Sequence, residues 1–322
     1  MLNRALKALL FAAAALMAGP ASAAETINLS IATGGTGGVY YPLGGGFANV
    51  LSKTVPGMQA TAEVTGGSVA NLQLIGTGKS YLALSQADAA ADALRGEDKF
   101  KGKPVPVRTL AILYPNRMHV VTIEGTGINT MADLKGKRVS TGSPGSATEV
   151  FAFRVIEAAG LDKDKDMTRE RLGVAESVGA IKDKKIDAFF WVGGLPTAAV
   201  TDLAASPGVK IKLIEHANLV PAMVKKYGNI YVEDAIPKAT YPGMTADNKQ
   251  STVMNILVVN ENMSEQTAYN ITKALFDSRK ELIAVHKEAE NIKLENQKEA
   301  ATPTPWHPGA LKFYKEKGVK LK

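Results

Sequence analysis

Short apolar runs alternate along the chain with longer segments in which apolar residues recur every three or four positions. This alternation is typical of an α/β protein, in which amphipathic helices cover a central sheet. The predicted strands are 27–32, 60–64, 81–85, 107–114, 186–191, 210–214 and 252–260, and 134–140 is predicted to form a turn and a strand. The predicted helices are 47–53, a helix ending near 76, 87–94, 147–159, 265–280 and 281–292.

The first segment of the chain has the pattern of an export signal. Arg4 and Lys7 precede an apolar run over 8–18, and a helix-breaking Gly-Pro pair leads to an A-x-A sequence at 21–23. The run is shorter than the ~20 residues that a membrane-spanning helix needs. We therefore expect residues 1–23 to be a cleaved signal peptide and the mature protein to be periplasmic. Without cysteine there is no residue for a lipoprotein anchor.

Length and composition narrow the classes of protein. A chain of 322 residues exceeds what one hydrophobic core usually fills, so two lobes are expected. The absence of cysteine excludes a disulfide scaffold, a thiolate metal site and a cysteine nucleophile. The net charge of +7 could indicate an acidic partner, but lysines are interspersed with acids, as in 163–166. We therefore expect no nucleic-acid partner.

Glycine and hydroxyl residues recur where predicted strands end, at 33–42, 65–68, 141–149 and 191–197. In open α/β sheets ligands bind beyond the carboxyl ends of strands, so the four clusters could converge on one cleft. Glycines let the backbone approach a ligand, and N–H groups at helix starts favour anions. A plain strand-to-helix turn remains the alternative for any single cluster. Ser146 and Glu149 also form an S-x-x-E capping box, which favours a structural role for Glu149 over a ligand contact.

Catalytic motifs are incomplete in this sequence. The segment 76–80 resembles the end of a phosphate-binding loop, but Gln73 occupies the position where that motif needs a glycine. The segment is also predicted to lead from a helix into a strand, whereas the motif leads from a strand into a helix. A dinucleotide-binding G-x-G-x-x-G motif beginning at Gly35 is incomplete, because Tyr40 occupies the position of its last glycine. The four histidines lie far apart, so neither a metal site nor a cofactor is expected. We expect no enzyme, although a secreted hydrolase using Ser68 or Ser146 stays open.

With these features in view, the mature chain resembles the TAXI family of solute receptors for TRAP transporters. The resemblance is carried by ATGGTGGVYYP (32–42), EVTGGS (63–68) with Asn71, QAD (86–88), STGSPGSATE (140–149), FWVGG (190–194) and HPGA (307–310). It implies an α/β type II periplasmic binding protein with a ligand cleft between two lobes and two crossover strands. We place the crossovers near 115–118 and 251–254. Lobe 1 then comprises 24–116 and 252–322, and lobe 2 comprises 117–251.

The resemblance also implies a ligand and a partner. The ligand would be a small carboxylate, such as glutamate or a related amino or dicarboxylic acid, that a monomeric receptor delivers to the membrane subunit of an ion-gradient-driven TRAP transporter. The implied ligand-binding residues are Thr36, Gly37, Gly38, Tyr40, Ser68, Asn71, Gln86, Ser143, Gly145, Ser146, Thr148, Trp191 and Gly193. A receptor of the same fold that serves an ABC permease or a sensor kinase is the main alternative.

Two further expectations concern arginines and one loop residue. The matched loops contain neither Arg nor Lys, so they predict no bidentate arginine clamp on a carboxylate. Arg154, within the predicted helix 147–159, is expected to pack or to lie on the surface. Ala147 stands where members of the resembled family commonly have glycine, which leaves the identity of the ligand open.

Overall fold

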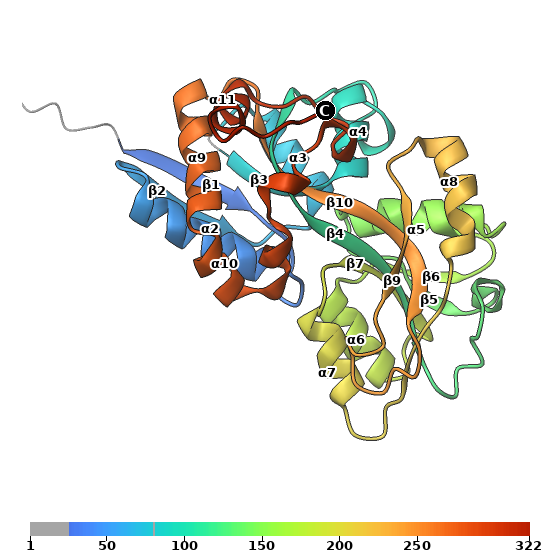
Figure 1. Cartoon of the computed structure of the whole chain (residues 1–322). Coiled ribbons are helices and arrows are strands. Elements are labelled where there is room, and N and C mark those ends of the chain that lie inside the picture. The colour runs from blue at the N-terminus through green and yellow to red at the C-terminus, as the bar shows by residue number, and fades with distance from the viewer. Residues whose placement is uncertain (1–25, 80) are drawn as a thin grey trace, which may run out of the picture.

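The computed structural model describes residues 26–79 and 81–322, so the predicted signal peptide lies outside the described residues. In the described part of the chain, no helix has the length and apolar character required to cross a membrane. Two lobes lie side by side, joined by long strands that run through the centre of the molecule (Figure 1).

One mixed sheet of ten strands runs through both lobes. Its main path is β2 (Met58–Glu63), β1 (Ile27–Ala32), β3 (Tyr81–Gln86), β10 (Asn248–Asn260), β4 (Val107–Ile123), β7 (Ala188–Gly193), β5 (Arg138–Ser140) and β6 (Thr168–Glu170). Two short strands join its flanks, β8 (Ile211–Leu213) on β4 and β9 (Val232–Ile236) on β10. The first three strands are parallel to one another, and so are β5, β6 and β7. All pairings of β4 and β10 are antiparallel.

The two longest strands, β4 and β10, connect the lobes. Residues 107–117 of β4 pair with β10, and residues 117–122 pair with β7 of the second lobe. Strand β10 pairs with β9 at 248–252 and with β3 at 255–259. Both strands are buried along most of their length, as expected for strands covered on both faces. The crossover positions predicted near 115–118 and 251–254 fall within these strands, whereas the lobe limits drawn from them stay a prediction.

The hydrophobic core is divided in the same way. One cluster collects apolar side chains from 29–114 and 256–314, and we call this part the first lobe. Two further clusters collect side chains from 118–253, together with Ala87 at the start of the first lobe's α4 (Ala87–Arg95), and form the core of the second lobe. Ala147 and Val150 are exceptions, because they follow the second lobe's β5 yet belong to the first lobe's cluster. The helix that carries them therefore joins the two lobes by packing.

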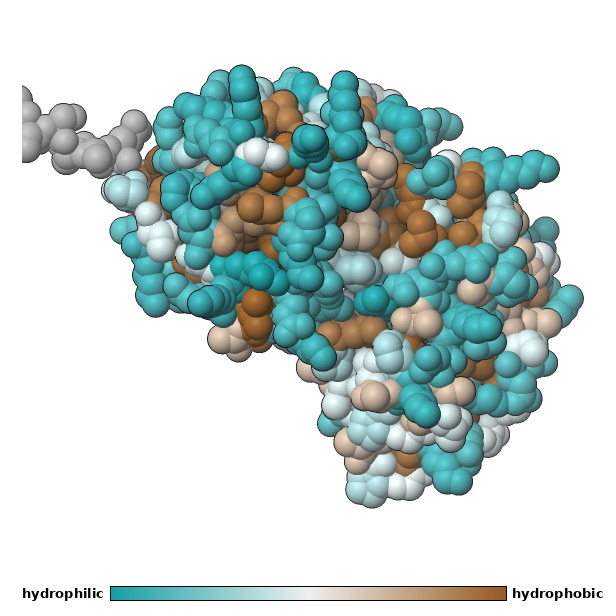
Figure 2. All heavy atoms as spheres, viewed as in Figure 1, coloured by the Kyte–Doolittle hydropathy of each residue, from teal (hydrophilic) through white to brown (hydrophobic). Residues whose placement is uncertain are grey.

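Ten α-helices cover the sheet in the described chain. They are α2 (Tyr40–Thr54), α3 (Ser68–Gly76), α4 (Ala87–Arg95), α5 (Ala147–Ala158), α6 (Val174–Lys182), α7 (Ala198–Ala205), α8 (Val220–Tyr227), α9 (Glu265–Asp277), α10 (Arg279–Val285) and α11 (Pro308–Glu316). The face drawn in Figure 2 is largely hydrophilic, and its apolar residues lie in separate patches.

Two predicted helices differ from the structure. The helix expected at 47–53 begins at Tyr40 and includes three glycines, which helix propensity disfavours. A Cβ at Gly44 would lie 2.3 Å from Thr33 Cγ2, so close packing selects glycine inside this helix. The helix expected at 281–292 ends at Val285, because His286 is extended and its ring accepts a hydrogen bond from Glu288 N. The helix-to-strand turn predicted at 76–80 is confirmed by the end of α3 and the start of β3.

Candidate functional site

A cavity of about 400 Å³ lies between the lobes, at the ends of several strands. Its wall is made by the segments that follow β1 (34–40), β2 (64–68), β5 (143–148) and β6 (171–176), and by the end of β7 (191–193). Gln86 of β3 and Tyr114 and Asn116 of β4 complete the lining. A volume of this size is typical of small-molecule sites, and its position at strand ends is that of ligand clefts in α/β proteins.

The structure brings most of the predicted site residues together. Eleven of the thirteen line this cavity: Thr36, Gly37, Gly38, Tyr40, Ser68, Gln86, Ser143, Ser146, Thr148, Trp191 and Gly193. They come from both lobes, as a cleft between lobes requires. Asn71 and Gly145 are absent from the lining.

Asn71 and Gly145 have structural positions instead. Asn71 is fully buried, and its Nδ2 donates to the carbonyl oxygens of Thr33 (2.7 Å) and Leu84 (2.8 Å). Its Oδ1 accepts a hydrogen bond from Thr65, so no polar atom of the side chain is left for a ligand. Gly145 accepts a hydrogen bond from Ala70 N at 3.0 Å through its carbonyl oxygen and has a positive φ of 78°. It therefore contributes to contact between the lobes.

The floor of the cavity carries polar atoms without partners. Gln86 Oε1, Tyr114 Oη and Asn116 Oδ1 are buried and have no hydrogen-bond partner among the described residues. Asn255 is the cross-strand partner of Gln86, and its Nδ2 is unpartnered in the same way. Buried polar groups are almost always hydrogen-bonded, and an unpaired one costs about 1–3 kcal/mol. The three such atoms that belong to the lining, on Gln86, Tyr114 and Asn116, indicate a place where a polar molecule completes the hydrogen bonds, whereas Asn255 lies outside the lining.

Tyr40 lies over this floor as a neutral donor. Its hydroxyl donates to Asn255 Oδ1 at 2.5 Å and lies 3.5 Å from Ser68 Oγ. Burial raises the pKa of Tyr40, with a nearby hydrogen bond from Ser68 only partly opposing it. Burial also raises the pKa of Tyr114 well above its usual value. Both phenols are therefore protonated at neutral pH and offer hydrogen bonds without charge.

Sequence reasoning missed Tyr114, Asn116 and Asn255, although a signal was present. Tyr114 and Asn255 interrupt apolar runs of β4 and β10, whereas Asn116 lies between Pro115 and Arg117, and both strands are buried along most of their length. Tyr114 and Asn116 are two positions apart, so they share one face of the strand. A polar side chain on a strand buried on both sides needs a partner, and this requirement could have identified all three.

The two lobes touch around the cavity through backbone atoms and one serine hydroxyl. Ala199 N donates to Gly37 O at 3.3 Å, and Ser143 Oγ donates to Gly66 O at 3.2 Å. These contacts join the two sides of the cleft, so the structure is a closed arrangement. The approach is close at two glycines of the first lobe: a Cβ on Gly66 would lie 2.5 Å from Pro144 O, and a Cβ on Gly38 would lie 2.8 Å from Trp191 Cη2.

The predicted capping box of α5 is only half formed. Ser146 is the N-cap, and its Oγ accepts a hydrogen bond from Glu149 N at 3.1 Å. The backbone N–H of Ser146 bonds to Ser143 O rather than to the carboxylate of Glu149. That carboxylate forms a bidentate pair with Arg171, with Nε–Oε1 at 2.6 Å and Nη2–Oε2 at 3.2 Å. The prediction of Glu149 as a reciprocal cap is therefore wrong, because nearby cations compete for its oxygens.

Arg171 is the second feature that the sequence did not predict. It precedes α6 and is the one Arg or Lys side chain in the described lining of the cavity. It comes from none of the loops that carried the family resemblance, which is why no arginine was expected at the site. The lining also contains one acidic residue, Glu176, in the first turn of α6.

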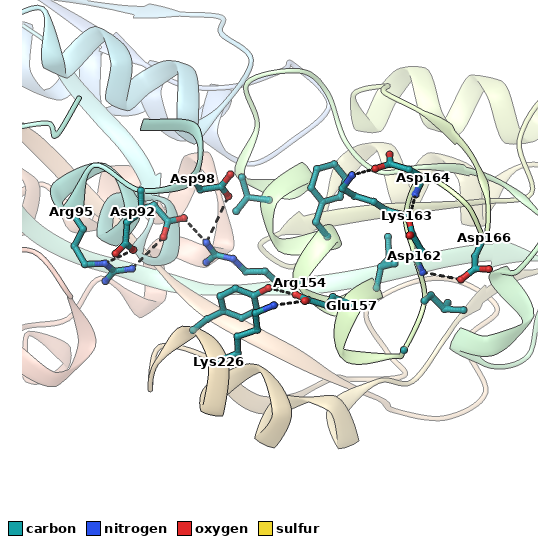
Figure 3. A pocket seen from close by; sticks show the side chains of 17 residues that line it. Asp92, Arg95, Asp98, Arg154, Glu157, Asp162, Lys163, Asp164, Asp166 and Lys226 are labelled. Atoms are coloured by element: carbon teal, nitrogen blue, oxygen red, sulfur yellow. Dashed lines mark hydrogen bonds and ion pairs between the residues drawn. The ribbon is translucent and has the colours of Figure 1, made fainter. Parts of the chain in front are cut away.

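A larger cavity of about 1130 Å³ lies elsewhere between the lobes, between α4, α5 and α8 (Figure 3). The charged side chains labelled there each have an oppositely charged partner, for example Glu157 with Lys226. Its charges therefore neutralise one another without a ligand. The smaller cavity, with its unpartnered polar atoms, is the better candidate for a ligand site.

Arg154 lines this larger cavity and is buried, so the expected packing role is confirmed and the alternative of a surface position is wrong. Its side chain is 7% exposed, and Nη2 lies 2.5 Å from Asp92 Oδ2 on α4. Nη1 donates to Tyr231 Oη at 2.7 Å, and that hydroxyl donates to Asp88. Burial raises the pKa of Asp92 to about 6, with Arg154 opposing the rise. Arg154 is therefore a buried ion-pair residue that joins α5 to α4.

The histidines lie in four separate settings. His119 Nε2 lies 2.9 Å from Tyr241 Oη, and His216 Nε2 lies 3.0 Å from Ser251 Oγ. His286 and His307 each contact a backbone carbonyl oxygen. Across residues 26–79 and 81–322, no group of three His, Cys, Asp or Glu side chains has the geometry to hold a metal ion.

A mixed sheet with two long shared strands and a cavity between its lobes is the architecture of a periplasmic solute-binding protein. The predicted two-lobe α/β fold is confirmed. The chain belongs to the NMT1-like family, whose model matches residues 31–318. This match does not resolve the narrower TAXI assignment.

Solved structures show the same fold at low sequence identity. A periplasmic transporter has a TM-score of 0.54 and 14% identity, with 94% of this chain and 100% of that chain covered. A protein from Bordetella bronchiseptica RB50 has a TM-score of 0.52 and 19% identity, with coverages of 90% and 82%. The alkanesulfonate-binding protein SsuA from Xanthomonas axonopodis pv. citri, bound to MOPS, has a TM-score of 0.50 and 17% identity, covering 84% of each chain.

Proposed function

We propose that this protein is an exported receptor that encloses a small polar organic molecule between its lobes and delivers it to a membrane transporter. The observation that carries the proposal is the group of unpartnered buried atoms at the floor of the 400 Å³ cavity. A ligand that bonds to both lobes favours the closed state, because closing adds contacts that the open state lacks.

The chemistry of the cavity favours a molecule with both a donor end and an anionic end. Gln86 Oε1 and Asn116 Oδ1 are acceptors, and they suit N–H groups such as an ammonium. The starts of α3, α5 and α6 and the guanidinium of Arg171 line other parts of the cavity, and they suit an anion. An amino acid of the glutamate type combines both ends.

Transport is favoured over catalysis by the state of the two candidate serines. Ser146 Oγ donates to Ser143 O and accepts from Glu149 N, while Ser68 Oγ accepts from Gln86 N. Neither hydroxyl has a histidine as a hydrogen-bond partner among the described residues, so neither has the base that a serine nucleophile needs.

The transporter that we propose is of the TRAP type, on the strength of the TAXI-like motifs in the cavity loops. The test has two parts. Mature protein, refolded to remove carried-over ligand, is heated with amino acids, dicarboxylates and MOPS, and glutamate or a close analogue should raise the Tm by several degrees. No shift with any member of the panel would contradict the proposed ligand class.

The second part separates transporter types. Vesicles that contain the membrane protein encoded beside this gene should accumulate the ligand when receptor and an ion gradient are supplied. Uptake that requires ATP instead would indicate an ABC permease and would refute the TRAP assignment. Mass spectrometry of the secreted protein should give a chain that begins at Ala24, as the predicted signal peptide requires.

A further inference from the structure

Only some of the N–H donors of the Arg171 guanidinium are hydrogen-bonded to described residues. Its Nε and one hydrogen of Nη2 face Glu149, and no described residue accepts a hydrogen bond from Nη1. A guanidinium has five N–H donors in one plane, so its terminal edge remains available for a second bidentate contact. The Arg171 side chain is 47% exposed and lines the cavity.

Glu149 holds this arginine within an excess of positive charge. Its side chain is 2% exposed, and it contacts Arg169 Nη1 at 3.3 Å and Lys99 Nζ at 3.5 Å in addition to Arg171. Three cations thus contact Glu149, and one of them, Arg169, also contacts Asp164 Oδ1 at 3.4 Å, so three cations share two carboxylates. Lys99 belongs to the 3₁₀ turn η1 (Asp98–Phe100) of the first lobe, whereas both arginines belong to the second. The charge of Arg171 is therefore not cancelled by its partner, and the cluster spans the junction of the lobes.

We propose that Arg171 is a specificity-determining residue that binds a carboxylate of the ligand through its terminal edge, and that Glu149 is the residue that positions it. The assignment rests on the proposed receptor function and names one charged contact within it. The start of α6 lies three residues further on, at Val174, and adds backbone donors on the same side of the cavity.

Glu176 is the charged group that could oppose this role. A Cβ on Gly173 would lie 2.4 Å from Glu176 Oε2, so the carboxylate folds back toward the first turn of its own helix. It is directed at the backbone before α6, and no ion pair joins it to Arg171 among the described residues. Removal of the Glu176 carboxylate should leave Arg171 in place and reduce the electrostatic repulsion of an anionic ligand.

Calorimetry with three probes tests the assignment: L-glutamate, L-glutamine and L-isoglutamine. Glutamine has an amide in place of the side-chain carboxylate of glutamate, and isoglutamine has an amide in place of its α-carboxylate. We expect wild-type protein to bind one amide less tightly than glutamate. Arg171→Gln should weaken glutamate binding by about 10- to 100-fold and abolish this discrimination. Arg171→Lys should recover only part, because lysine cannot form the bidentate contact.

Arg169→Gln is the matched control, because Arg169 contacts the same carboxylate without lining the cavity, and it should change glutamate binding less than threefold. Introduced alone, Glu149→Gln should weaken glutamate binding and reduce the discrimination between glutamate and the amide. Introduced into the Arg171→Gln variant, it should have no further effect on either. Glu176→Gln should leave binding unchanged or strengthen it. Ligand-free thermal unfolding of Arg171→Gln should match wild type, since the side chain is half exposed.

The outcomes separate the two proposals. Wild-type protein that binds glutamate while Arg171→Gln retains the same affinity and discrimination would overturn the role of Arg171 and leave the receptor function standing. Equal losses in Arg169→Gln and Arg171→Gln would also overturn it, in favour of a general effect of charge. Wild-type protein that binds no acid of the panel would refute the proposed function, and this assignment with it.

Discussion

At the scale of single residues, Gly38 shows most directly how closing depends on the absence of a side chain. A Cβ there would lie 2.8 Å from Trp191 Cη2, and Trp191 is held by a hydrogen bond from its Nε1 to Thr197 Oγ1 at 2.9 Å. A shift of the tryptophan would break this hydrogen bond within the second lobe, and a shift of the loop would move it away from the second lobe.

Gly38→Ala should therefore fold normally and bind ligand at least tenfold more weakly, as measured by calorimetry on the refolded protein. Gly45→Ala on the adjoining helix α2 is the control, because Gly45 lies outside the cavity lining and nothing lies within 4 Å of a Cβ at that position. Equal affinities of the two variants would mean that the contact between Gly38 and Trp191 has no part in closing.

Substitutions of two buried asparagines should distinguish a residue that binds ligand from one that stabilises the fold. Asn116 has an unpartnered Oδ1 at the floor of the cavity, whereas the amide of Asn71 is fully engaged by backbone and Thr65. Asn116→Leu should leave the free energy of unfolding unchanged or higher, because an unpaired acceptor is removed, while ligand affinity falls. Asn71→Leu should cost about 2 kcal/mol or more, because it leaves buried backbone acceptors unpaired.

Denaturant unfolding and calorimetry on both variants check this contrast. If Asn116→Leu were the less stable variant and retained full affinity, the floor would be structural, and the argument for a ligand site there would fail.

At the scale of elements, helix α5 joins the lobes by packing into the cores of both. Its N-terminus faces the cavity, and seven residues further on Arg154 pairs with Asp92 of α4. Removing one partner of a buried ion pair is costly, because it leaves the other charge buried and unpaired. Arg95 pairs with the same aspartate from the surface, where its side chain is 46% exposed.

Arg154→Met should lower the free energy of unfolding by about 3–5 kcal/mol at pH 8, and Arg95→Met by less than about 1 kcal/mol. The deficit of Arg154→Met should shrink as the pH falls. Burial already raises the pKa of Asp92 to about 6, and losing Arg154 raises it further, so protonation relieves the buried charge at low pH. Urea unfolding at pH 5 and pH 8 measures both effects, and a deficit that grew at pH 5 would contradict the explanation.

The sequence predicted some elements better than others, for a physical reason. Apolar runs identified the central strands, since these are buried on both faces. The helices α6, α7 and α8 have eight or nine residues each, and β6 has three half-exposed or exposed residues, so they lack a clear period. Arg171 directly follows β6, which explains why a charged residue of the cavity went unnoticed. The glycine-rich loops were recognised because turns and helix starts require particular residue types locally.

At the scale of the whole molecule, the buried histidines link stability to pH. His119 lies on β4, and His216 is hydrogen-bonded to Ser251 on β10, so both support the strands shared by the lobes. Burial lowers the pKa of each to about 4, from a usual value of 6.5. The folded protein therefore holds both rings neutral, whereas the unfolded chain binds protons below pH 6.5.

It follows that the stability contributed by these rings is complete above pH 6.5 and is lost as the pH falls toward 4. At pH 5 the loss should be on the order of 2 kcal/mol for each histidine. The Tm should fall between pH 7 and pH 5, and His216→Gln should show a shallower fall. An unchanged slope in that variant would assign the pH dependence to other groups.

The polar floor has a consequence for the order of events in binding. Gln86, Tyr114 and Asn116 come from β3 and β4, that is, from the first lobe and a strand that it shares. A molecule can therefore dock on a complete platform before the second lobe arrives with Trp191 and the loop after β5. Capture would be a fast collision followed by a slower enclosure, and the time for which the molecule stays held would be set by how often the lobes part.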